Sequence, residues 1–534
     1  MDENSKDCVV IIELKQRSQV SLTDKDAVVL TRFSHGIEET NHPSYQAWSY
    51  ATLLYSFNET VERDEIQLEP CAYLHNYKED DGIITNAFYQ EYLDKSPIFL
   101  QKDKVKLQQF IKKFVKYGDK NKIMYRIDEG KIRPSKWLAD SLVSMIQWNQ
   151  EFVMIDDQKL VYEQALALAQ QSQSWKKQVF IVEWWPWTGK TVVAINLLVE
   201  LNKRRLVTQY VSKNSAPRQV YASKLTGTLK QTHISNLFLW SGSFIDVERW
   251  GIDALIVDEA HRLNEKSGMF SNLWENQIKE IIHAAKFSLF FIDEDQKVTL
   301  KDIGAIDEIK KRAKHHDAEI YRMELTSQFR CSGSDGYLSW LDNHLQIHET
   351  ANITLDGIPY DFQVFDNPAQ MRDAIIEKNK INNKARLVAW YCRDWISKKN
   401  PLAYDIEFPE YKFAMRWNLS TDGMLWIIKP ESVNEIGCIH TCQGLEVDYI
   451  GVIIGDDMIV RNGKIITNPH NRARTDASLK WYKSLLKTDE ADTLERTDSI
   501  IKNTYRTLMT RGMKWCYIYC TDAETREYFR QMMR

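Results

Sequence analysis

Hydrophobic positions along the chain follow one pattern before about residue 151 and another after it. The short β-branched run over 8–14 predicts a strand, and helical periodicity over 43–60 predicts a helix. A lysine-rich stretch over 102–122 predicts an amphipathic helix, whose lysines either form a solvated face or track phosphates. After residue 151, apolar runs of strand length alternate with helical patterns. This alternation predicts an α/β fold with parallel sheets, and its length predicts two such units.

Eight apolar runs in the second part have the length and composition of buried strands. They cover residues 179–182, 206–211, 254–259, 288–293, 385–391, 436–441, 449–455 and 515–520. Helical patterns separate most of them, so we expect the strands to pair in parallel within two sheets.

Length and composition limit the classes of protein that the chain can represent. At 534 residues and 62.7 kDa it exceeds what one hydrophobic core usually supports, so we expect about three domains. The net charge of −4 leaves nucleic-acid binding open, because basic residues can gather in a local groove. No apolar run approaches a membrane span, the polar start is unlike a signal peptide, and the eight cysteines lack CxxC spacing. These features predict a cytoplasmic protein without a membrane partner.

The segment 179–198 carries the strongest chemical signal. A buried strand leads into a loop that ends in Thr188, Gly189, Lys190 and Thr191, and an apolar helix follows, as in a phosphate-binding Walker A loop. In such a loop the lysine reaches the β- and γ-phosphates, the threonine ligates Mg²⁺, and the helix N-terminus favours the anion. The sequence therefore predicts binding of ATP and Mg²⁺.

Tryptophans make this loop depart from the usual pattern. Trp184 stands where the pattern has glycine, and Trp185 and Trp187 add bulky rings where backbone N–H groups must approach phosphate closely. The 20 glycines and 17 tryptophans together make up about 7% of the chain, the share that glycine alone usually has. In certain bacterial lineages the codon UGA is read as glycine, and we expect that some of these tryptophans are glycines in the native protein. Further candidates are Trp240, Trp274 and Trp515.

Charged residues near the ends of later strands complete a hydrolytic pattern. The run LIVDEAHR contains Asp258, which we expect to hold Mg²⁺, and Glu259, which we expect to activate water. Gln296, in DEDQ, is a candidate for sensing the γ-phosphate. Arg330, in QFR, and Arg511, in TRG, are candidates for stabilising phosphoryl charge, although isolated arginines of this kind are more often structural.

The ordered motifs GKT, DEAH, DEDQ, QFR, CIHTCQGLE and TYRTLMTRG resemble those of superfamily 1 helicases, and more narrowly those of the bacterial family with a Schlafen-type helicase domain. The resemblance covers about 151–534 and implies two RecA-like domains with the nucleotide bound in the cleft between them. It implies that Gln158 contacts adenine. It also implies that Gly444 and Glu446 couple the nucleotide to a nucleic-acid strand.

The segment CIHTC invites a test for metal binding. Cys438, His440 and Cys442 would share one face of a strand, but three ligands without a fourth nearby are a weak metal signal. Structural cysteines in a buried strand are the favoured interpretation.

The N-terminal segment resembles the core of PD-(D/E)xK nucleases of the RecB type. Glu13 and Lys15 lie in the first predicted strand, and Gln46 and Tyr50 lie in a helix. That family places a partner aspartate on a preceding strand, and Asp7 adjoins the same strand as Glu13, so it cannot lie across a hairpin from it. We therefore expect a chain that is truncated at its N-terminus and has no nuclease activity.

These observations predict four segments. They are a partial nuclease-like domain over 1–120, a linker over 121–150, and RecA-like domains over 151–325 and 326–534. The fold class expected is α/β, with two RecA-like P-loop NTPase domains preceded by a partial restriction-endonuclease-like domain.

The sequence best fits an ATP-dependent helicase or translocase that acts on DNA or RNA, provided that the loop tryptophans are recoded glycines. The alternative is a non-catalytic nucleic-acid-binding or scaffold protein with a diverged loop that no longer binds nucleotide. A third reading, a defence-related nuclease whose motor moves DNA, conflicts with the incomplete nuclease-like segment.

Overall fold

The computed structural model describes residues 1–128, 130, 153–174, 176–186, 188–266, 276–325, 334–358, 360–390, 393–418, 423–473 and 476–533. The chain forms two compact units. The first unit comprises residues 1–171, 189–200 and 324–327, and the second unit comprises residues 172–188, 201–323 and 328–534.

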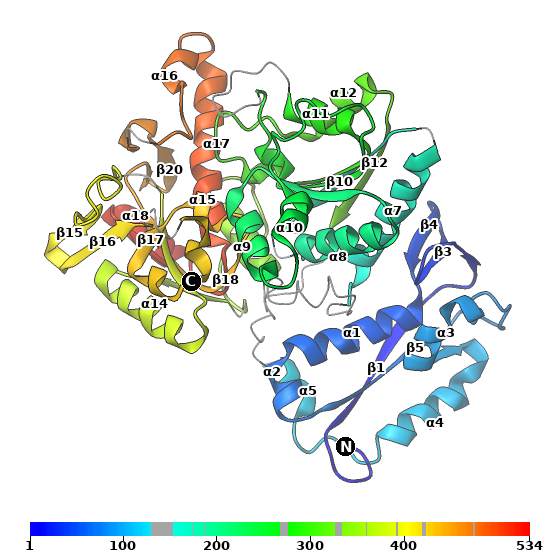
Figure 1. The fold of residues 1–534 in the computed structure, drawn as a ribbon. Coiled ribbons are helices and arrows are strands. Elements are labelled where there is room, and N and C mark those ends of the chain that lie inside the picture. Colours follow the sequence, from blue (N-terminus) through cyan, green and yellow to red (C-terminus); the bar gives the residue numbers. More distant parts are fainter. Residues whose placement is uncertain are drawn as a thin grey trace. The chain divides into compact units, whose positions relative to one another are not determined.

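The first unit is built on a parallel sheet with the strand order β1-β5-β6, drawn in blue shades in Figure 1. β1 pairs with β5 along its whole length, from Cys8 opposite Gln67 to Lys15 opposite Leu74. A second, antiparallel sheet has the order β2-β3-β4. The strands are β1 (Cys8–Lys15), β2 (Val20–Leu22), β3 (Val28–Phe33), β4 (Gly36–Asn41), β5 (Gln67–Leu74) and β6 (Ile98–Leu100).

Helices of the first unit begin at recognisable caps. The ring of His42 accepts a hydrogen bond from the Ser44 N–H at 3.2 Å, and Pro43 occupies the first turn of α1, where its missing N–H is not needed. The helices are α1 (Pro43–Phe57), α2 (Glu59–Arg63), α3 (Gln90–Lys95), α4 (Lys104–Phe114), α5 (Ile123–Asp128), α7 (Asp156–Gln171) and most of α8 (Lys190–Lys203).

The second unit contains a six-stranded sheet with the order β12-β7-β11-β10-β8-β9. The pairs formed by β7, β11, β10, β8 and β9 are all parallel, and the strands are almost fully buried because both faces are apolar. The strands are β7 (Gln178–Trp184), β8 (Thr208–Ser212), β9 (Phe238–Leu239), β10 (Ile252–Asp258), β11 (Ala285–Ile292) and β12 (Glu319–Leu325). The helices of this part are α9 (Ser215–Leu225), α10 (Gln231–Leu237), α11 (Gln277–Ala284) and α12 (Ile306–His315), with short 3₁₀ helices η4 (Ala260–Arg262) and η5 (Glu294–Gln296).

A seven-stranded sheet with the order β13-β21-β18-β14-β17-β16-β15 completes the second unit. Only β15 and β16 pair antiparallel within it. Its strands are β13 (Asp361–Val364), β14 (Ala385–Ala389), β15 (Ile406–Phe408), β16 (Phe413–Trp417), β17 (Glu435–Gly437), β18 (Val447–Ile454) and β21 (Gly512–Cys520), and β19 (Met458–Arg461) pairs with β20 (Lys464–Thr467) in a separate hairpin. The helices are α13 (Ser334–His344), α14 (Pro368–Asn382), α15 (Ile439–Cys442), α16 (Tyr482–Leu485), α17 (Glu490–Met509) and α18 (Ala523–Met532).

The predicted α/β class with parallel sheets is confirmed, and each predicted apolar run overlaps an observed strand. Two expectations about single elements are wrong. The run 436–441 leaves the sheet after Gly437 and continues as the helical turn α15, and the helix expected over 102–122 ends at Phe114. The domain boundaries and the RecA-like and nuclease-like descriptions remain predictions.

Among the described residues, no helix is both long enough and apolar enough to cross a membrane.

Candidate nucleotide and nucleic-acid site

The phosphate-loop motif has the expected strand, turn and helix. β7 ends at Trp184, and the N–H and hydroxyl of Thr188 both donate to the carbonyl oxygen of Trp185, at 3.3 and 2.9 Å. Gly189 has a φ of +74°, a left-handed conformation that glycine adopts without steric cost, and α8 begins at Lys190. The helix start offers backbone N–H groups and a positive dipole end, so this segment fits a phosphate ligand.

The described tryptophans of the loop differ in burial, and their backbone conformation is ordinary. Trp184 is buried at the end of β7, whereas Trp185 is 42% exposed. Trp187 lies outside the described residues. Among the described residues from 184 to 189, only Gly189 has a positive φ, so the backbone at Trp184 and Trp185 does not itself require glycine.

The other tryptophan candidates differ in their surroundings. Trp240 packs its ring over Gly242, where an added Cβ would lie 2.5 Å from the ring. Trp515 lies within β21, and the ammonium of Lys378 is 3.6 Å from its ring centre. Trp274 lies outside the described residues.

Asp258 and Glu259 lie at the carboxyl end of β10, within the parallel sheet. The Tyr210 hydroxyl donates to the Asp258 carboxylate, and the Glu259 N–H donates to Asp258 Oδ1 at 2.9 Å. Burial and the charge of Asp258 raise the pKa of Tyr210 well above its usual value, so Tyr210 keeps the proton that it donates. Glu259 is fully buried at a φ of +54° and lies 3.0 Å from His261 Nε2. Non-glycine residues held in this conformation cluster at functional sites.

Gly444 lies beside Glu259. Its φ is +81°, and a Cβ at this position would lie 2.8 Å from Pro217 Cγ and 3.8 Å from Glu259 Oε1. Glycine is therefore required here both by backbone conformation and by space. The structure thus brings together two residues that the sequence placed in separate motifs, while Glu446 lies two residues further on and is half-buried.

Gln443 joins several of these segments, and sequence reasoning missed it. Its side-chain oxygen accepts from Arg262, and its amide nitrogen lies 3.4 Å from His261 Nε2 and 3.5 Å from the Gln296 carbonyl oxygen. Its backbone carbonyl accepts from Asn214 Nδ2 at 2.7 Å. The signal was present, because Gln443 directly precedes Gly444 in the motif TCQGLE.

Gln296 is fully buried in η5, just after β11. Its amide donates to Asp293 Oδ2 at 2.8 Å. The same oxygen lies 3.6 Å from Arg506, which is also bonded to Asp342 at 2.5 and 3.0 Å. Burial raises the pKa of Asp293, although the charge of Arg506 opposes that shift.

The surroundings of the remaining predicted residues do not by themselves point to a role. Arg511 is buried, donates to the Thr507 carbonyl oxygen at 3.0 Å, and has no carboxylate partner among the described residues. Gln158, near the start of α7, is buried, and its side-chain oxygen lies 3.4 Å from the Ile155 nitrogen. Arg330 lies outside the described residues.

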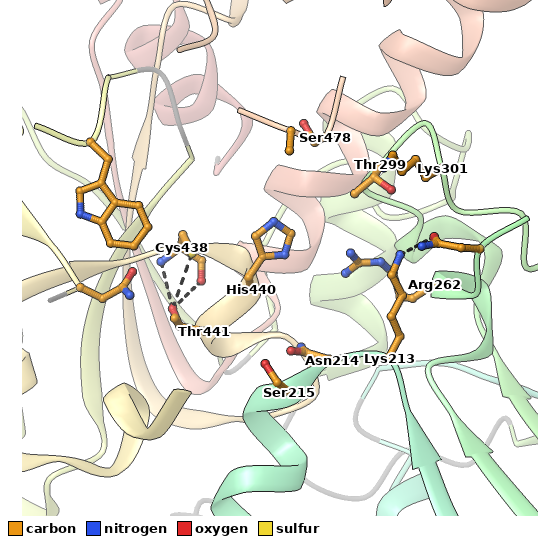
Figure 2. A pocket seen from close by; sticks show the side chains of 14 residues that line it. Lys213, Asn214, Ser215, Arg262, Thr299, Lys301, Cys438, His440, Thr441 and Ser478 are labelled. Atoms are coloured by element: carbon orange, nitrogen blue, oxygen red, sulfur yellow. Dashed lines mark hydrogen bonds between the residues drawn. The ribbon is translucent and has the colours of Figure 1, made fainter. Parts of the chain in front are cut away.

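A pocket of about 470 Å³ lies in the second unit, between loops of its two large sheets (Figure 2). Lys213 and Arg262 reach it from one sheet and both pair with Asp302, at 3.0 and 2.9 Å. Burial lowers the pKa of Lys213 to about 8, and burial together with the charges of Arg262 and Lys213 lowers the pKa of His440 to about 3. The lining comprises Lys213, Asn214, Ser215, Arg262, Asn264, Thr299, Lys301, Trp395, Asn418, Cys438, His440, Thr441, Ala477 and Ser478. This lining is basic and contains an indole ring, which suits a chain of phosphates and bases.

Cysteine and histidine in CIHTC do not form a shared strand face. Cys438 caps the short helix α15, and the Thr441 hydroxyl lies 3.9 Å from its sulfur. Burial raises the pKa of Cys442 to about 12, which disfavours the thiolate that a metal needs. Within the described part of the chain, no group of three or more candidate ligands could hold a metal ion.

The four nuclease-like residues lie near one another in the first unit. Glu13 and Lys15 form an ion pair of 2.6 Å on β1, and the Gln46 amide donates to the Tyr50 hydroxyl at 2.9 Å on α1. Gln46 and Tyr50 also donate to the carboxylate of Asp156, at 2.8 and 2.9 Å.

Asp156 is an unexpected member of this cluster. Its φ is +39°, and burial raises the pKa of its carboxyl, with the charges of Asp157 and Glu13 acting in the same direction. It lines a pocket of about 440 Å³ together with Lys15, Arg17, Phe33, Thr40, Asn41, Gln46, Tyr50, Asp157 and Leu160. Asp7, by contrast, pairs with Arg126.

Parallel α/β sheets, a phosphate-loop motif and a DEAH segment at a strand end define a helicase-like P-loop NTPase. The chain belongs to the Schlafen group 3, DNA/RNA helicase domain family, whose model matches residues 177–522, more than half of its length. It is also 23% identical over 403 residues to the uncharacterized protein YPL245W of Saccharomyces cerevisiae (strain ATCC 204508 / S288c), covering 67% of this chain and 86% of that protein.

Three solved structures resemble the chain weakly. A DNA replication initiation factor covers 42% of this chain and 60% of its own, with 14% identity and a TM-score of 0.19. The Sulfolobus solfataricus SWI2/SNF2 ATPase core in complex with dsDNA covers 68% and 86%, with 11% identity and a TM-score of 0.21. The Pif1 helicase from Candida albicans covers 42% and 54%, with 10% identity and a TM-score of 0.20. The chain thus spans less than two thirds of the first and third of these proteins.

Proposed function

We propose that this chain is an ATP-dependent motor that moves along DNA or RNA. The observation that carries the proposal is the cluster around Gln443. This residue contacts His261 and Arg262, which lie two and three residues after Glu259, and Arg262 also lines the basic pocket. A single buried amide therefore connects the segment expected to hydrolyse ATP with the pocket expected to hold the strand.

The nucleotide roles follow from the chemistry of each residue. Lys190 and the start of α8 would bind phosphate, and Thr191 and Asp258 would hold Mg²⁺, which neutralises phosphate charge when bound. Glu259 would orient and deprotonate the attacking water. Gln296 would respond to the γ-phosphate, Arg511 and Arg330 would stabilise the charge that develops on it, and Gln158 would contact adenine. The roles of these four residues follow from the resemblance to the helicase family.

The strand-binding role follows from the pocket. Lys213, Arg262 and Lys301 supply positive charge for phosphates, and Trp395 supplies a surface on which a base can stack. Gly444 and Glu446 would couple the state of the nucleotide to this pocket.

The test is nucleic-acid-stimulated ATP hydrolysis by the full chain with Trp184, Trp185 and Trp187 replaced by glycine. Single-stranded DNA and single-stranded RNA are assayed in parallel. We expect turnover that nucleic acid stimulates and that Lys190→Ala abolishes. A matched control is Lys176→Ala, because Lys176 is a 60% exposed lysine paired with Glu319. Nucleic-acid binding without any turnover would instead support the non-catalytic alternative.

The proposal assigns no nuclease activity to the first unit. Its parallel sheet and the cluster of Glu13, Lys15, Gln46 and Tyr50 support descent from a nuclease-like domain. Asp7, the acidic residue just before β1, is ion-paired with Arg126 and does not form a carboxylate pair with Glu13.

A further inference from the structure

Two tryptophans, Trp250 and Trp481, have left-handed backbone conformations. Trp250 has a φ of +69° and lies in the turn before β10, and Trp481 has a φ of +74° and lies directly before α16. The remaining left-handed residues in the described part of the chain are glycines, short polar or charged residues, and one alanine. Tryptophan, with its bulky aromatic side chain, is unusual among these residue types.

Steric contact explains why this conformation is unusual for tryptophan. With φ positive, Cβ crowds the following carbonyl oxygen, so a residue that has a side chain is strained in this conformation. Glycine has no Cβ and adopts the conformation readily. The backbone conformation at positions 250 and 481 therefore favours glycine.

The side chains of these tryptophans gain little from their surroundings. Trp481 is 55% exposed, and its ring is approached by Lys301 at 4.9 Å and Lys480 at 5.5 Å. Lys177 and Arg249 each lie 5.6 Å from the ring centre of Trp250, and its indole nitrogen is buried without a hydrogen-bond partner among the described residues. Trp340 shows the opposite situation, since it is fully buried in α13 and donates to the Met532 carbonyl oxygen at 2.9 Å.

We infer that the native protein has glycine at positions 250 and 481. The inference rests on backbone angles and side-chain surroundings, so it is independent of the phosphate-loop motif that first suggested recoding. It also leaves Trp340 as a true tryptophan, so that only some of the 17 tryptophans are affected.

Glycine at 481 also changes the basic pocket. Lys301 lines that pocket, and its ammonium now lies over the Trp481 ring. Without the indole, Lys301 loses this cation–π contact.

The decisive experiment reads the codons of the gene and the peptide masses of the protein isolated from its natural source. TGA at positions 250 and 481, with peptides of glycine mass, supports the inference, and TGG at these positions overturns it. TGG is expected at position 340.

A variant provides a second, physical test. Trp481→Gly should raise the thermal unfolding midpoint by about 1–3 °C, because it relieves a left-handed side chain that is mostly exposed. Trp340→Gly is the control and should lower the midpoint, because it empties a buried site. An unchanged or lowered midpoint in Trp481→Gly would mean that tryptophan is the native residue at position 481.

Discussion

The Arg262 guanidinium donates to the side-chain oxygen of Gln443, and both residues are buried. Arg262 lies three residues after Glu259 and lines the basic pocket, and Gln443 lies directly before Gly444, which approaches Glu259 from the other large sheet. The side-chain hydrogen bond therefore joins the two segments, and Gly444 fits beside Pro217 because it lacks a side chain. A shift in either segment must be accommodated by the other.

Removing the Gln443 side chain should weaken coupling between strand and nucleotide. In Gln443→Ala the buried guanidinium of Arg262 loses an acceptor, and leaving such a donor unsatisfied costs about 1–3 kcal/mol. We expect nucleic-acid-stimulated ATP turnover to fall by roughly tenfold or more. Gln531→Ala, which alters an exposed glutamine bonded to Glu527, is the control. Full stimulation in Gln443→Ala would remove the basis of the proposed coupling.

Adding a methyl group at Gly444 should destabilise the second unit. Gly444→Ala combines left-handed strain with a close approach to Pro217, and we expect a loss of about 2–3 kcal/mol in the free energy of unfolding. Gly463→Ala is a matched control, because Gly463 has a φ of +74° but open space around it, so only the strain applies. Denaturant unfolding measures both. Equal losses in the two variants would show that the contact with Pro217 relaxes without cost.

Nucleic-acid binding in the pocket should weaken as the pH rises through about 8. Burial lowers the pKa of Lys213 to about 8, so this lysine loses its positive charge as the pH passes that value, and phosphate then meets one cation fewer. His440 does not contribute to this change, because it is already neutral well below this range. Fluorescence anisotropy at pH 6.5 to 9.5 measures the effect.

Lys213→Arg distinguishes titration of Lys213 from a general effect of pH. Arginine stays charged throughout this range, so the fall in affinity near pH 8 should disappear. Lys213→Ala should lower affinity at every pH and reduce the slope of log affinity against log salt by about 1. An unchanged pH profile in Lys213→Arg would assign the titration to another group.

The first unit should not cleave DNA. We expect no cleavage of linear DNA by the full chain with Mn²⁺, because the carboxylate of Glu13 is ion-paired with Lys15 and that of Asp7 with Arg126, so the two do not form a metal-binding pair. Cleavage that Glu13→Ala abolishes would contradict this expectation and would direct attention to Asp156 as the replacement carboxylate. Glu69→Ala is a suitable control for that assay, because Glu69 lies on the neighbouring strand β5.

Local sequence patterns predicted most of the parallel strands, because apolar runs of this length between turns have few other structures available. These local patterns were less reliable where an apolar run is short. Residues 438–442 are compatible with a strand and a helix, and contacts with the rest of the second unit decide for the helix.

Contacts between distant residues escaped prediction altogether. Gln443 and Arg262 are 181 residues apart, and Asp156 is 110 residues from Gln46. No local pattern encodes such pairs, since they depend on which strands become neighbours. The motif glycine Gly444 was found, but its approach to Pro217 and Glu259 required the fold.

The hydrogen bonds of Asp156 have a practical consequence for dividing the chain. The family match begins at residue 177, yet α7 and Gln158 precede that point, so a fragment cut there lacks the expected adenine contact. A fragment that starts at residue 153 keeps Gln158 but deprives the Asp156 carboxylate of its donors Gln46 and Tyr50. The smallest piece of this protein that can be expected to behave as the whole chain does therefore includes α1 and the β1-β5-β6 sheet on which it packs.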